Sequence, residues 1–208
     1  MSGILDLIQG ELGKSVINNI SQASGEENSK TNSVLTMAIP VLLQAMKNNS
    51  KSEQGSSSLQ NALNKHDGSL LDNLDGFFGG GVDDSAKTDG SKILGHILGQ
   101  KQNHVEQALS TKSGVNSSSV SEILKIAAPI VMNMLGKQNR ESSASSVTDV
   151  LSGLLGNNSQ NSQQGFLEQM LDSDGDGSVI DDVAGMLLGG NKKSDGLGGI
   201  IGNIFGKK

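Results

Sequence analysis

Apolar residues recur every three or four positions at the start of the chain, which is the spacing of one helix face. They are Ile4, Leu5, Ile8, Leu12, Val16, Ile17 and Ile20. A polar stretch follows, in which Gly25 predicts the end of this helix. Residues 33–47 are then apolar on nearly every side, and this pattern predicts a buried central helix. Pro40 lies inside that helix and predicts a kink, because proline lacks a backbone N–H donor.

The pattern returns at an offset of 89 residues, so the second half of the chain matches the first. Identical pairs include Ile4/Ile93, Leu5/Leu94, Ile8/Ile97, Gly25/Gly114 and Pro40/Pro129. Agreement of identity and hydrophobic pattern over an ungapped stretch indicates an internal duplication. The sequence therefore predicts an all-α fold of small helical bundle units, duplicated in tandem, with flexible Gly/Ser/Asn-rich linkers and tail.

Shifts in composition suggest four regions. We expect a first helical repeat over residues 1–85, a second over 91–157, a calcium-loop-like segment with a helix over 165–190, and a Gly-rich tail over 191–208. Mobile linkers are expected near residues 50–60, 82–90, 137–146 and 157–164, where small polar residues are frequent.

A serine followed three residues later by aspartate occurs in three similar stretches, as Ser69/Asp72, Ser146/Asp149 and Ser178/Asp181. Such a pair resembles a capping box, in which the hydroxyl and the acid satisfy free backbone donors at a helix start. Each stretch ends in apolar residues and then glycine, which is typical of a helix stop. We expect short capped helices at all three places.

The composition narrows the class of protein. Of 208 residues, 34% are apolar and 2% aromatic, and there is no cysteine, so a core of aliphatic helices is expected without disulfides or thiolate metal sites. The net charge of −6 disfavours nucleic acid as a partner. The N-terminus lacks the basic leader of a secretory signal, and no apolar run reaches the ~18 residues of a membrane span. We expect a cytoplasmic protein.

The stretch LDSDGDGSVIDD over residues 171–182 follows the spacing of an EF-hand- or dockerin-like calcium loop. Side-chain oxygens fall at the first, third and fifth positions, glycine at the sixth, and Val183 stands where a closing acid is usual. The predicted Ca²⁺ ligands are Asp172, Asp174, Asp176, Ser178, Asp181 and Asp182.

An acidic, solvated turn is the alternative interpretation of this loop. A related stretch at an offset of 109 residues keeps Asp67, Gly68, Ser69 and Asp72 but has Leu63 and Lys65 in place of the first two acids. The DGSxxD element therefore occurs where no ion can be held. Asp172 and Asp174 carry the calcium hypothesis, because three alternating carboxylates repel one another unless a cation lies between them.

Other patterns give no catalytic site. The three histidines have no metal-binding spacing and are interpreted as surface or cap residues, and no serine lies in a Gly-x-Ser-x-Gly elbow. We predict a non-enzymatic structural or interaction protein with an unknown protein partner or self-association. The weakest alternative is a hydrolase that uses acidic residues interpreted here as parts of turns.

The last segment, DGLGGIIGNIFGKK, places Leu197, Ile200, Ile201, Ile204 and Phe205 on one helical face ahead of two lysines. It could dock on the bundle or on a partner groove, or lie on a membrane surface. Docking is favoured, because one short segment with two lysines binds lipid weakly.

The duplicated helix with its buried proline, followed by HDGSLLDNLDGFFGGG, resembles the bacterial domain-of-unknown-function family 937. The resemblance covers roughly residues 1–155, with LDSDGDGSVIDDVAGML as a further match. It implies an all-helical bacterial protein with no established activity, so it assigns no catalytic residue to this chain.

Overall fold

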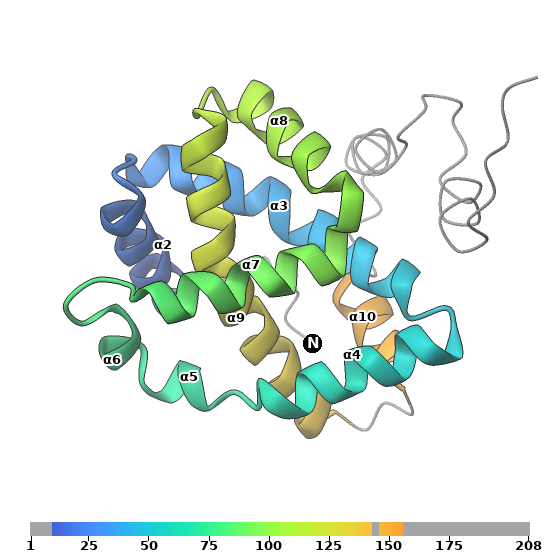
Figure 1. The fold of residues 1–208 in the computed structure, drawn as a ribbon. Coiled ribbons are helices and arrows are strands. Elements are labelled where there is room, and N and C mark those ends of the chain that lie inside the picture. Colours follow the sequence, from blue (N-terminus) through green and yellow to red (C-terminus); the bar gives the residue numbers. More distant parts are fainter. Residues whose placement is uncertain (1–9, 143–145, 156–208) are drawn as a thin grey trace, which may run out of the picture.

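Helices form the architecture of the part of the chain that the structure, a computed structural model, describes: residues 10–142 and 146–155 (Figure 1). The prediction of an all-α fold is confirmed. The elements are α2 (Glu11–Ser24), α3 (Asn28–Asn49), α4 (Glu53–Lys65), α5 (Ser69–Asp72), α6 (Leu74–Phe78), α7 (Asp84–Leu98), the 3₁₀ turn η1 (Gly99–Lys101), α8 (Gln102–Ser113), α9 (Ser117–Glu141) and α10 (Val147–Leu155).

Two long helices, α3 and α9, lie at the centre and contact most of the others. Each is apolar on nearly every side, so other helices must cover it all round. Among the described helices, α9 is long and apolar enough to cross a membrane, but 72% of that stretch is buried by its neighbours, as in a core helix. Both helices continue through their internal prolines, Pro40 and Pro129.

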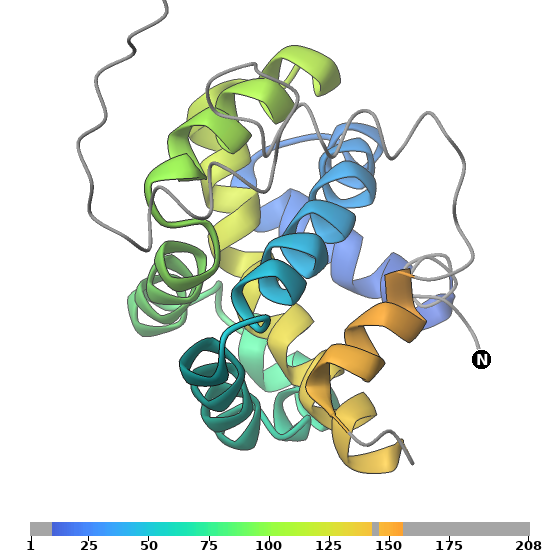
Figure 2. The ribbon, with the colours of Figure 1, turned by 90° about the vertical axis from the view of Figure 1, so that its right-hand side faces the viewer.

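The helices of the two halves pack across one another. The helix before each central helix contacts both centres: α2 packs on α3 and α9, and α8 packs on α9 and α3. The helix after each centre contacts the centre of the other half, α4 on α9 and α10 on α3. Figure 2 shows α10, in orange, at the periphery of the bundle. The two halves therefore share one core, while their division at residues 85 and 91 stays a prediction from the sequence.

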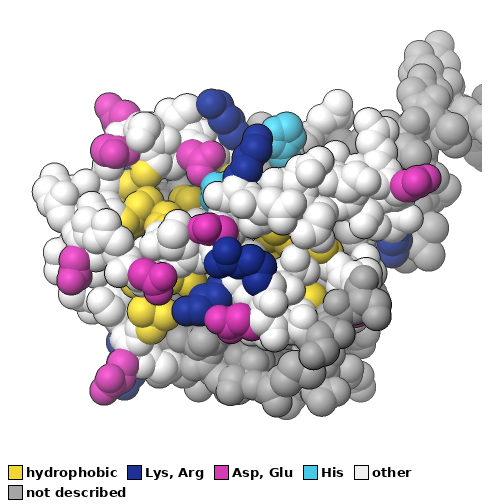
Figure 3. Space-filling view, turned by 90° about the horizontal axis from the view of Figure 1, so that it is seen from below, with side chains coloured by type: hydrophobic (Ala, Val, Ile, Leu, Met, Phe, Trp, Pro, Cys, Tyr) yellow, Lys and Arg dark blue, Asp and Glu magenta, His cyan; other side chains and the backbone are white. Residues whose placement is uncertain are grey.

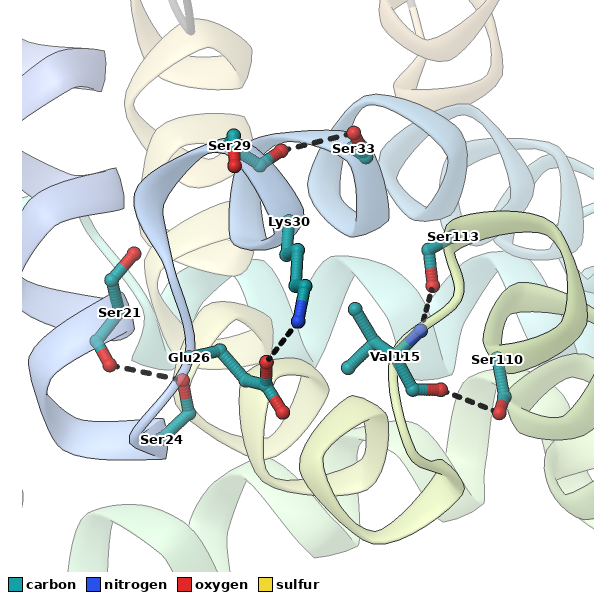
Figure 4. A network of polar contacts seen from close by, with 9 residues as sticks. All are labelled: Ser21, Ser24, Glu26, Ser29, Lys30, Ser33, Ser110, Ser113 and Val115. Atoms are coloured by element: carbon teal, nitrogen blue, oxygen red, sulfur yellow. Dashed lines mark hydrogen bonds and ion pairs between the residues drawn. The ribbon is translucent and has the colours of Figure 1, made fainter.

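The turns that lead into α3 and α9 share a left-handed glycine but differ in their side-chain hydrogen bonds. The hydroxyl of Ser24 donates to the carbonyl of Ser21, whereas the hydroxyl of Ser110 donates to the carbonyl of Val115 (Figure 4). Gly25 and Gly114 end α2 and α8 with φ of 71° and 69°, a left-handed conformation that glycine adopts without strain. Their N–H groups donate to the carbonyls of Ser21 and Ser110. The predicted stop at Gly25 is confirmed, and the 89-residue offset preserves the left-handed glycine as well as the sequence.

Several linker predictions are wrong, because side-chain caps start helices inside them. Residues 53–60 belong to α4, and the hydroxyl of Ser52 accepts a hydrogen bond from the N–H of Gly55. Residues 84–90 belong to α7, where the carboxylate of Asp83 accepts from the N–H of Ala86 at 2.7 Å. Residues 137–141 belong to α9. Serine and aspartate suggest loops by composition, yet they are among the best residues at a helix start.

The predicted capping boxes have different outcomes. At Ser146 and Asp149 half of the box forms: the N–H of Asp149 donates to the Ser146 hydroxyl, and that hydroxyl, not the backbone N–H of Ser146, donates to the carboxylate of Asp149 at 2.9 Å. Ser69 does not cap: its own N–H donates to the carboxylate of Asp67, and Gly68 precedes the short α5 with φ of 94°. The third pair, Ser178 and Asp181, lies outside the described residues.

Candidate functional site

An apolar pocket opens between α2, α3, α5 and α9. Its volume is about 40 Å³, and every lining residue is aliphatic, methionine or glycine. The lining residues are Leu12, Gly13, Val16, Ile17, Ile20, Leu35, Ile39, Leu71, Ala127, Ile130, Val131 and Met134. A pocket without polar groups offers no hydrogen bonds to orient a reacting molecule, so it suits apolar contact rather than chemistry.

The size of the pocket limits what it can hold. Small-molecule sites usually enclose about 300–1,000 Å³, far more than this pocket. The rim is partly open, because Leu12 is 41% exposed and Val16, Leu71 and Met134 are half-buried. The space therefore fits one or two anchoring side chains of a segment that lies across the rim.

The 89-residue offset relates this pocket to a filled groove on the other half of the molecule. At this offset α2 corresponds to α8, α3 corresponds to α9, and α9 corresponds to α3. The helix α7 packs against α8, α9 and α3, and so covers the groove that they form. Counterparts of the lining residues, Val105, Leu109, Leu124, Val41 and Leu42, are fully buried there. On α7 the buried residues facing this core are Ile93, Leu94, Ile97 and Leu98. The pocket therefore lies where an α7-like segment belongs.

A polar cluster joins the turn between α4 and α5 to α9. The buried amide of Asn133, 4% exposed, accepts from the N–H of Gly68 at 3.0 Å and donates to the carbonyl of Pro129 at 2.9 Å. Its nitrogen lies 3.4 Å from Nδ1 of His66, whose Nε2 lies 3.9 Å from the carboxylate of Asp89. These contacts satisfy backbone groups at a helix junction, which is a structural role.

The same junction includes an ion pair. Arg140 donates to the carbonyl of Asp67 and lies 3.6 Å from its carboxylate. Hydrogen bonds from Ser69, and then the nearby Arg140 charge, hold the pKa of Asp67 below its usual value. His66 is interpreted from the sequence as a surface or cap residue. In the structure it is the C-cap residue of α4, directly after Lys65, and it is partly buried.

All six predicted calcium ligands, Asp172, Asp174, Asp176, Ser178, Asp181 and Asp182, lie outside the described residues. Asp67 is the counterpart of Asp176 at the 109-residue offset, and it serves a turn and an ion pair. Among residues 10–142 and 146–155, no group of three His, Asp or Glu side chains could hold a metal ion.

The surface seen from below mixes charges of both signs. Lys and Arg side chains alternate with Asp and Glu side chains there, and apolar side chains reach the surface in separate patches between them (Figure 3). Lys87, Glu122 and Lys125 form a charged cluster between α7 and α9. The carboxylate of Glu122 lies 3.2 Å from Nζ of Lys87 and 3.2 Å from Nζ of Lys125. Burial raises the pKa of Glu122, but the two lysines outweigh it and hold the value below the usual one.

The described fold and its pocket define a class: an all-helical protein with two central helices and a small apolar pocket. The chain belongs to the family described as "Bacterial protein of unknown function (DUF937)", whose model matches residues 6–138 and 140–208. The resemblance to this family seen in the sequence is thereby confirmed. No curated protein and no solved structure matches the chain.

The pocket was not predicted from the sequence, although a signal for it was present. Ile93, Leu94 and Ile97 have counterparts in Ile4, Leu5 and Ile8, so the offset implies two similar grooves. Only the structure shows that one groove is filled by α7 and that the other has a partly open rim.

Proposed function

We propose that this protein is a non-enzymatic interaction protein that binds an apolar helical segment in the pocket between α2, α3, α5 and α9. The observation that supports this function is the correspondence with the groove on the other half, which the second half of α7 fills. We expect the partner segment to follow the pattern of residues 93–98 in α7, which read ILGHIL. In this pattern two adjacent aliphatic residues are followed by two residues of any kind and then by two more apolar residues.

The energetics suit reversible docking. Full burial of an aliphatic side chain contributes about 1.5–3 kcal/mol. Two such side chains contribute about 3–6 kcal/mol before the cost of ordering the segment, so dissociation constants of about 0.1 mM or weaker are expected. Affinity of this order suits a tethered or multivalent partner more than a free one.

Titration of a fluorescent peptide with the sequence of residues 90–101 into the full-length protein, followed by anisotropy, tests this function. We expect saturable binding that Leu12→Glu abolishes, because a carboxylate at the rim must be desolvated against apolar side chains. Asn18→Glu is the matched control, since Asn18 is exposed on α2 and does not line the pocket. Absence of saturable binding, or equal loss in both variants, would overturn the proposal.

Calcium binding by the loop at residues 172–182 is proposed as a second property. It is supported by the spacing of Asp172, Asp174, Asp176 and Gly177, which follows the first half of a calcium loop. Bound calcium would offset two of the three negative charges on these alternating carboxylates and fix the turn. Calorimetric titration of the full-length protein with calcium tests this property.

A further inference from the structure

The end of the chain repeats the part of α7 that is buried. Residues 93–101 read ILGHILGQK and residues 200–208 read IIGNIFGKK, with five of nine positions identical. Four of the positions that α7 buries lie in the first stretch, at Ile93, Leu94, Ile97 and Leu98, and all four are apolar in the second stretch. These are Ile200, Ile201, Ile204 and Phe205. The segment therefore carries the side chains that a groove of the α7 type accepts.

We infer that residues 200–208 of the same chain dock in the apolar pocket between α2, α3, α5 and α9. This inference rests on the proposed function and names its occupant. Residues 156–199 connect the end of α10 to this segment, and a chain of that length reaches up to ~150 Å when extended. Tethering supplies an effective concentration of the order of millimolar, which compensates for a weak contact.

The N-terminal stretch with Ile4, Leu5 and Ile8 is the competing occupant, and two observations disfavour it. It has Gln9 at the position of Leu98, which α7 buries, and a buried amide without a partner is costly. The turn also differs. Gly99 ends α7 at φ 55° and begins η1, whereas its counterpart Gly10 is extended, with φ of −70° and ψ of 176°.

The geometry after Gly10 strengthens this distinction. The counterpart of η1 is residues 10–12, and there α2 already begins at Glu11. The turn that brings α7 back over α8 and α9 is therefore absent before α2. A segment from elsewhere in the chain can enter the pocket without that turn.

Cysteine pairs test the inference directly, because the full chain contains no cysteine. In full-length protein, Leu71→Cys at the pocket combined with Phe205→Cys should form an intramolecular disulfide under mild oxidation. Thr111→Cys, exposed on α8, combined with Phe205→Cys is the control and should cross-link at least tenfold more slowly. Faster cross-linking of Leu71→Cys with Ile4→Cys would overturn the inference in favour of the N-terminal stretch. Cross-linking only between two chains would also overturn it, in favour of a second copy.

Peptide binding separates failure of the inference from failure of the proposed function. A tail docked in its own pocket competes with the added peptide of residues 90–101. The double variant Ile204→Asp/Phe205→Asp should therefore bind that peptide at least several-fold more tightly than the unchanged protein. Equal affinity in both proteins overturns the tail as occupant and leaves the docking function standing. Absence of binding to both proteins overturns the function and the inference together.

Discussion

Gly90 of α7 lies directly against the main-chain carbonyl of Lys125 in α9, where a β-carbon on Gly90 would be 1.8 Å from the oxygen. In a regular helix this carbonyl accepts from the N–H of residue 129, but that residue is proline and has none. The glycine therefore brings α7 close to α9 at the carbonyl that the proline leaves without its helical partner. A Cα–H contact is the interaction available there. This relationship gives Pro129 an architectural role.

Gly90→Ala should destabilise the protein although alanine is the better helix former. The added methyl group must push α7 away from α9, because the nearest atoms are backbone and cannot rotate aside. We expect the free energy of unfolding to fall by about 1–3 kcal/mol, as for other overpacked sites. Urea denaturation followed by circular dichroism measures the change.

Gly95→Ala on the same helix is the control for this experiment. A β-carbon there meets nothing within 4 Å, so only the helix propensity changes. We expect no loss, and a gain of up to ~1 kcal/mol. Similar effects at the two positions would show that Gly90 is not a close-contact site.

Asn133→Ala should be costly for a different reason. The substitution removes the acceptor for the buried N–H of Gly68 and the donor to the carbonyl of Pro129. A buried group left without a partner costs about 1–3 kcal/mol. Gln44, the counterpart of Asn133 in α3, bonds only to the side chain of Asn48 among the described contacts, so Gln44→Ala should cost clearly less. Equal losses in urea denaturation would contradict the role assigned to Asn133.

Asp83 makes stability depend on pH below about 4. Hydrogen bonds from the N–H of Ala86, and then from the hydroxyl of Ser85, hold the pKa of this carboxyl below its usual value. The folded state then binds fewer protons than the unfolded state, so this contribution is present above the unfolded pKa and is lost as pH falls through the folded one.

Asp83→Asn separates the charge from the cap, because asparagine also caps helices but does not titrate. We expect the melting temperature of the unchanged protein to fall more steeply than that of Asp83→Asn between pH 5 and pH 2. Asp83→Ala should be less stable at every pH, since it loses the cap itself. Parallel melting curves for the unchanged protein and Asp83→Asn would exclude this contribution.

The helices that could be predicted are those whose sequence determines both ends and the buried face. Gly25 ends α2 as expected, and the nearly uniform apolar stretch around Pro129 is buried as expected. Gly136 shows where the same reasoning fails. It follows Leu135 as a stop would, but α9 continues through it to Glu141. A β-carbon at Gly136 would be 1.9 Å from the carbonyl of His66, so this glycine serves a contact with α4.

Contacts between distant segments were beyond prediction for a physical reason. A glycine looks the same in the sequence whether it ends a helix or admits a neighbouring backbone, and only the packing distinguishes the two. The pocket had the same ambiguity: apolar residues such as Leu12 and Met134 fit a helix face whether or not another segment covers them. The sequence match at the 89-residue offset supplied the missing information, because it allowed one groove to be compared with the other.

The calcium hypothesis predicts that calcium binding depends more on Asp172 and Asp174 than on Asp176. Asp176 corresponds to Asp67, whose carboxylate accepts from the N–H of Ser69 and pairs with Arg140, whereas Asp172 and Asp174 correspond to Leu63 and Lys65. Calorimetric titration of the full-length protein with calcium should therefore give binding heat that Asp172→Asn/Asp174→Asn abolishes. Asp84→Asn, exposed on α7, is the control and should leave the heat unchanged. Because Val183 replaces the closing acid, the affinity should be weak, near the millimolar end of known loops. A protein that gives no heat with calcium has an acidic turn at residues 172–182 and no cation site there.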